Sequence, residues 1–143
     1  MSAAWTAVPL AALLLAAATN KAVSDQVDQG QALYAETCAS CHGANLEGQP
    51  DWRRRLDTGR MPAPPHDETG HTWHHSDATL FRITKQGIAA VVGNGYKSDM
   101  PGFENLLSDE EIRQVLDYIK STWPPRAREA QVEITRSDRA ASQ

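Results

Sequence analysis

The sequence is poor in cysteine and in aromatic side chains, and it carries no excess of positive charge. Two cysteines in 143 residues are too few for a disulfide scaffold. The 14 Lys and Arg residues stand against 18 Asp and Glu, and the resulting charge of −4 argues against nucleic-acid binding. Apolar residues at 41% and charged residues at 22% are ordinary globular usage, which excludes a disordered or collagen-like chain. The length favours one domain.

A run of apolar residues lies close to the N-terminus. Residues Ala3 to Ala18 carry no charge, but the run is shorter than the roughly 20 apolar residues that a spanning helix needs. It matches the apolar core of a secretory signal, with small residues at 16–18 for cleavage, although no positive charge precedes it. We therefore predict that residues 1–22 are a signal peptide or an N-terminal anchor, and that the chain is periplasmic or membrane-tethered.

Helix signals occur at three places along the rest of the chain. Each combines an N-cap residue type with apolar residues at spacings of three and four. Residues 43–75 are rich in Gly and Pro, which predicts an extended loop, and residues 125–143 predict a flexible C-terminal tail. The predicted helix starts are Ser24 or Asp25, Ser76 or Asp77 with Gly87 as the stop, and Ser108 with Glu111 as a capping box.

The two cysteines belong to the motif Cys38-Ala-Ser-Cys41-His42, the C-x-x-C-H pattern of covalent haem attachment. Two thiols at this spacing reach two vinyl groups of one porphyrin, and the adjacent histidine then lies beneath the iron as a ligand. A redox-active cysteine pair and half of a zinc site are the alternatives. The zinc site lacks further cysteines, and no strand pattern precedes the motif as a redox pair requires.

From about residue 26 to residue 123 the chain resembles the class I c-type cytochromes, which are small bacterial monohaem electron carriers. The landmarks that carry the resemblance follow the family's order: Gly30, Tyr34, the motif at 38–43, Gly48-Gln49-Pro50, Asp-Met-Pro-Gly-Phe at 99–103, and the last amphipathic helix. The resemblance implies an all-α fold, with three to five short helices around one covalent haem. The implied monohaem domain spans residues 23–124.

The resemblance also implies roles for particular residues. Gly30 provides a small contact for Tyr118 or Leu116 where the first and last helices cross. The carbonyl of Pro50 accepts the Nδ1–H of His42, and Met100 supplies the second axial ligand of the iron.

Met61 is a rival to Met100, because it is also followed by a proline. Its alternative role is to fill a gap beneath the haem edge.

A histidine-rich segment has no role in the resemblance. The sharpest hypothesis is a second metal site for copper or zinc. Other hypotheses are a bond from Trp73 or a histidine to a haem propionate, a pH-sensitive docking patch, a plain polar loop, or a histidine as sixth ligand. The histidines concerned are His66, His71, His74 and His75.

The function predicted from these features is electron transfer by one covalent haem c and its iron, with axial ligands His42 and Met100, in an exported carrier that is not an enzyme. The partners are a redox donor and acceptor, at least one with a basic docking patch, and neither nucleic acid nor a second copy of the chain. Residues 1–22 are the possible membrane contact. The alternatives are a haem enzyme or gas sensor with an open sixth position, or a dedicated subunit of a dehydrogenase or oxidase.

Overall fold

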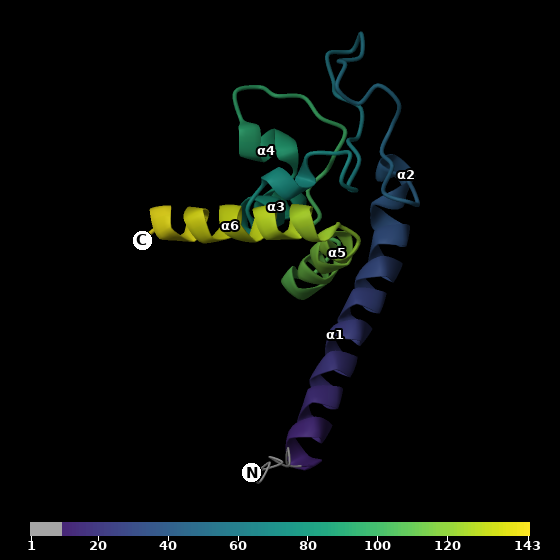
Figure 1. Ribbon diagram of the computed structural model, residues 1–143. Helices are drawn as coiled ribbons and strands as arrows, with labels where there is room; N and C mark the ends of the chain where they lie inside the picture. The colour runs from purple at the N-terminus through teal and green to yellow at the C-terminus, as the bar shows by residue number, and fades with distance from the viewer. Residues whose placement is uncertain (1–9) are drawn as a thin grey trace.

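The computed structural model describes residues 10–143, which form six α-helices, one 3-10 helix and no strand (Figure 1). The predicted all-α class is confirmed, with one helix more than the three to five expected. The elements are α1 (Leu10–Thr37), α2 (Ala39–His42), the 3-10 helix η1 (Thr72–His74), α3 (Asp77–Gln86), α4 (Ile88–Val92), α5 (Asp109–Ser121) and α6 (Pro125–Ala141).

Helix α1 is much longer than predicted, because it runs through the expected start at Ser24 and Asp25 without a break. The alanines and leucines before Ser24 are strong helix formers, so nothing there ends the helix. Lys21 and Asp25 form an ion pair of 2.9 Å one turn apart on its exposed face. The predicted signal peptide or anchor lies partly outside the described residues. Within residues 10–143, no helix has both the length and the apolar character needed to cross a membrane.

Helices α1 and α5 cross at close quarters, in the C-terminal half of α1 (Figure 1). A Cβ atom on Gly30 would collide with the carbonyl oxygen of Gln114 and come within 3.1 Å of the Tyr118 Cβ. The predicted contact between Gly30 and Tyr118 is thus confirmed. The side chains of Gln29 and Gln114 add a hydrogen bond of 2.9 Å beside the crossing.

Helix α5 supplies the largest part of the apolar core. The predicted capping box is confirmed: the Glu111 N–H donates to the Ser108 hydroxyl, and the Ser108 N–H donates to the Glu111 carboxylate. That second bond lowers the pKa of Glu111. The apolar face of the helix then lies against α1 and α3. The buried residues of this face are Ile112, Val115, Leu116 and Ile119.

Helix α3 begins and ends where the sequence predicts. The hydroxyl of Ser76 accepts a hydrogen bond from the Thr79 N–H, and Gly87 ends the helix with a φ of +84°. The short helix α4, which the sequence analysis did not predict, follows directly. The loop that contains Met100 then returns to α3, where the N–H of Phe103 donates to the carbonyl of Thr84.

The prediction of a flexible tail at 125–143 is wrong, because these residues form helix α6. Pro125 occupies the first helical position, where its missing N–H costs nothing. The buried face of α6 is polar apart from Ala127, and a search for an apolar stripe therefore overlooks it. Gln131 is only 3% exposed, and its Nε2 donates to the carboxylate of Asp77 (2.8 Å) and the hydroxyl of Thr135 (3.0 Å).

Replacing Gln131 by leucine is expected to lower the free energy of unfolding by about 1–3 kcal/mol, because the half-buried Asp77 carboxylate and the buried Thr135 hydroxyl each lose a donor. The measurement is urea unfolding of the haem-loaded protein. Glu129→Gln, at an exposed position of the same helix, is the control and should change stability by less than about 0.5 kcal/mol. Equal stability of the two variants would mean that α6 is not held by this network.

Candidate haem site

The Cys38–His42 motif lies at the joint between α1 and α2. Cys38 precedes the first turn of α2, and its carbonyl accepts hydrogen bonds from the N–H groups of Cys41 (3.1 Å) and His42 (3.0 Å). One helical turn therefore holds the two thiols and the imidazole together. Cys38 is half-buried, Cys41 is exposed, and both thiols are free. Burial raises the pKa of the Cys38 thiol.

The imidazole of His42 is 6% exposed and makes one hydrogen bond, between its Nδ1 and the carbonyl oxygen of Pro64 at 2.8 Å. A carbonyl only accepts, so Nδ1 carries the proton and Nε2 has a free lone pair. Burial also lowers the pKa of His42, which favours the neutral ring. This is the state and orientation that a metal-ligating histidine requires.

The prediction that Pro50 accepts the His42 proton is wrong, since Pro64 does so. Gln49 and Ala63 exchange two hydrogen bonds, one from the Gln49 N–H and one to its side-chain oxygen. These bonds close residues 50–62 into a separate loop, and after this loop the chain returns to His42 at Pro64. Nothing in the sequence distinguishes the prolines that follow the motif.

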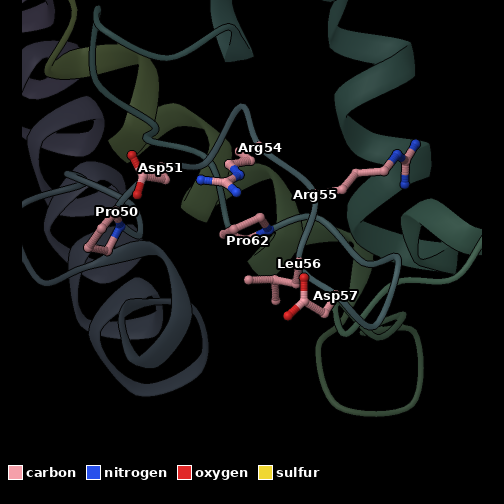
Figure 2. Close-up of a pocket in the computed structure, with 7 residues that line it drawn as sticks. All are labelled: Pro50, Asp51, Arg54, Arg55, Leu56, Asp57 and Pro62. Atoms are coloured by element: carbon pink, nitrogen blue, oxygen red, sulfur yellow. The ribbon is translucent and has the colours of Figure 1, made fainter.

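Pro50 itself is exposed and lines a cavity of about 240 Å³ on the loop of residues 50–62. Figure 2 shows this cavity, with the side chain of Arg54 directed toward the side of Asp51 and that of Arg55 extending away. The cavity contains neither the motif nor a methionine, and we assign it no role in the site. Its lining residues are Pro50, Asp51, Arg54, Arg55, Leu56, Asp57 and Pro62.

Met100 is half-buried and packs against the apolar core. Its N–H donates to the hydroxyl of Ser98 at 3.1 Å, and an ion pair of 2.7 Å joins the neighbouring Asp99 to Arg60. Because Arg60 directly precedes Met61, the two candidate methionines lie on facing segments of chain. Met61 is half-buried too, but it is not among the residues packed against the core.

His71 and His75 meet edge-on, with 5.5 Å between their ring centroids, whereas the other two histidines of the cluster stack on different rings. His66 stacks on His42, His71 stacks on Trp52, and His74 stacks on Trp73. No group of three or more His, Cys, Asp or Glu side chains within residues 10–143 could hold a metal ion. The described residues therefore do not support the hypothesis of a second metal site on this loop, because no third ligand joins the pair of His71 and His75.

Two tryptophans have contacts that bear on the predictions. The indole N–H of Trp73, a candidate donor to a haem propionate, donates to the carbonyl of Glu68 at 3.3 Å. Trp123 is 2% exposed, and its indole N–H donates to the carbonyl of His66 at 2.7 Å. No sequence pattern assigned Trp123 a role beside His42, because this contact joins residues 57 apart in sequence.

The donor set of this region fits a covalently attached haem. Two free thiols and an imidazole with a free Nε2 share one turn, and two thioethers lie on facing loops. Histidine and methionine are the axial ligands typical of c-type haems. A structural zinc site would need four ligands, and the described residues contain no such cluster.

Residues 27–123 match the family model of cytochrome c, and the chain belongs to this family. The chain therefore carries covalently bound haem c with its iron and takes part in haem-based electron transfer. This confirms the resemblance to the c-type cytochromes.

Three curated relatives share this region. The chain is 30% identical over 103 residues to the cbb3-type cytochrome c oxidase subunit CcoP of Azospirillum brasilense, covering 70% of this chain and 30% of the relative. It is 26% identical over 93 residues to the subunit FixP of Azorhizobium caulinodans (65% and 28%). A nitrite reductase of Stutzerimonas stutzeri is 22% identical over 106 residues (74% and 18%). The chain thus spans less than a third of these relatives, and no solved structure matches it.

Proposed function

We propose that this protein is an exported one-electron carrier whose haem is attached to Cys38 and Cys41 and held by His42 and Met100 as axial ligands. The observation that carries the proposal is the bond of 2.8 Å between His42 Nδ1 and the carbonyl of Pro64. That bond leaves Nε2 free, on the same turn as the two free thiols. The haem supplies one-electron redox chemistry when bound, and a closed coordination sphere suits a carrier rather than an enzyme.

The packing of Met100 supports its choice over Met61. Its side chain contacts the core, while its backbone is anchored through Ser98 and through the ion pair of Asp99 with Arg60. A ligand on an anchored loop stays near the iron in both oxidation states, which keeps the rearrangement on electron transfer small. Met61 then fills space on the facing segment.

Donation of electrons to a dedicated oxidase is the second candidate function. It is supported by the relatives, two of which are cbb3-type oxidase subunits that include a region similar to this chain. In either case we propose a periplasmic location, with export or tethering through residues 1–22, and a monomeric chain. The net charge of −4 favours at least one partner with a basic docking patch.

The test is an optical spectrum of the exported protein in the oxidised state, in the reduced state, and in the reduced state under CO. We expect sharp reduced bands of a c-type haem that CO does not change, because both axial positions are filled. A spectrum that CO shifts in the wild-type protein would contradict His/Met ligation and favour the haem enzyme or sensor. The His42→Ala variant, which lacks one proposed ligand but keeps both thiols, is the positive control for CO binding.

A further inference from the structure

His66 lies directly against the proposed iron ligand. Its ring is stacked on that of His42, with 4.0 Å between the ring centroids and 21° between the planes. Tyr34, which is 1% exposed, meets the ring of His66 edge-on with the centroids 6.2 Å apart. His66 is therefore enclosed between a core tyrosine and the imidazole that faces the haem.

The backbone of His66 is fixed on both sides of its Cα atom. Its N–H donates to the carbonyl of Leu46 at 2.8 Å, and its carbonyl accepts the indole N–H of Trp123 at 2.7 Å. These bonds attach the segment after Pro64 to the loop that follows the motif and to the end of α5. The Cα atom of His66 is thus anchored to two separate parts of the fold.

The ring of His66 is fixed as well. Its Nδ1 lies 2.8 Å from the hydroxyl oxygen of Thr72, which is itself 6% exposed and donates to the carbonyl of Pro65 at 3.4 Å. Since that hydroxyl donates to Pro65, its oxygen accepts the Nδ1–H of His66. The stacked ring consequently has one defined plane.

We infer that His66 is a positioning residue, which fixes the ring plane of His42 by stacking on it and so sets the reduction potential of the haem. The inference rests on the proposed ligation by His42. A fixed plane keeps the Nδ1–H of His42 aligned with the Pro64 carbonyl, and this bond makes the imidazole a stronger donor to the metal. A stronger donor favours the ferric state, which means that loss of the stack raises the potential.

Three variants distinguish the effect of ring stacking on the potential from the effect of side-chain size and from that of the hydrogen bond between His66 and Thr72. His66→Leu removes the ring, His66→Phe keeps a ring for stacking, and Thr72→Val removes the hydroxyl that orients the ring. We expect His66→Leu to shift the reduction equilibrium at least about threefold toward the ferrous state, ~28 mV at 59 mV per tenfold. Thr72→Val should shift it in the same direction by less, and His66→Phe should stay close to wild type. His74→Leu, which loses a stacked ring on the same loop, is the control without effect.

Two readouts exclude a merely structural role. The potential is measured together with the proton NMR shifts of the haem methyl groups in the ferric protein, whose pattern follows the plane of the axial imidazole. A packing defect alone lowers thermal stability and leaves both unchanged. An unchanged potential and methyl pattern in His66→Leu overturns the inference, as does a shift in His66→Phe equal to that in His66→Leu.

Two further results keep the test decisive. If His66→Leu does not retain haem, Thr72→Val decides alone, and an unchanged potential in that variant overturns the inference. The CO spectrum of the wild-type protein distinguishes this failure from failure of the proposed function. Wild-type protein that ignores CO, combined with unchanged potentials in the variants, removes only the role of His66.

Discussion

Replacing Met100 by alanine is expected to convert an iron that ignores CO into one that binds it stoichiometrically, and to lower the reduction potential. The thioether of methionine stabilises the ferrous state, so its loss favours the ferric state. The alanine side chain cannot reach the metal, which leaves the sixth position to water or to an added ligand. Reduced-minus-oxidised spectra with and without CO, together with a redox titration, measure both effects.

The loop around Met100 keeps its anchors in this variant. The ion pair of Asp99 with Arg60 does not involve the Met100 side chain, and neither does the bond from the Phe103 N–H to the carbonyl of Thr84. The variant should therefore retain its haem and its helical circular-dichroism spectrum. CO binding in a folded variant reports the lost ligand rather than a lost structure.

Met61→Ala is the matched control, because Met61 is a half-buried methionine on the facing segment and also precedes a proline. We expect it to leave the CO-insensitive spectrum unchanged and to cost stability only through lost packing. If Met61→Ala opened the iron while Met100→Ala did not, the two roles would be exchanged and the assignment of Met100 would be wrong.

Gly30→Ala is expected to destabilise the protein by about 3 kcal/mol, the upper end of the typical range for overpacked sites. The added methyl group collides with the backbone carbonyl of Gln114, which cannot rotate away as a flexible side chain would. Helices α1 and α5 must therefore separate. Alanine is the better helix former by about 1 kcal/mol, so a loss of stability cannot come from helix propensity. Urea unfolding of the haem-loaded variant measures the effect.

The control for Gly30→Ala is Ser24→Ala, an exposed position earlier on the same helix. It should change the free energy of unfolding by less than about 0.5 kcal/mol, as surface substitutions do. Wild-type stability in Gly30→Ala would mean that the two helices do not approach as closely as the structure places them.

The parts of the fold that could be predicted from sequence are those fixed by local chemistry. Ser108 and Glu111 mark the start of α5 because each satisfies a backbone donor of the same first turn. Ser76 and Gly87 bound α3 in the same local way. The motif at Cys38 is also local, since one turn of helix is enough to bring its side chains together.

What could not be predicted depends on contacts between distant residues. Pro64 reaches His42 because Gln49 pairs with Ala63. The residues around each proline do not predict that pairing, because it joins positions 14 apart in the sequence. The face of α6 that contains Gln131 is polar, and its partners at His75 and Asp77 become visible only once the chain has folded. The role of Trp123 beside His66 is hidden for the same reason.

The crossing of α1 and α5 has a consequence for the order in which the protein folds. The hydrogen bond between Gln29 and Gln114 joins residues 85 apart in sequence, so the crossing must close a long loop before it contributes any stability. Contacts of such high sequence separation form slowly, whereas the turn that contains Cys38 and Cys41 forms from local bonds. We therefore expect the thiols to reach their positions for haem attachment before α5 docks, so that the chain encloses the haem as it closes.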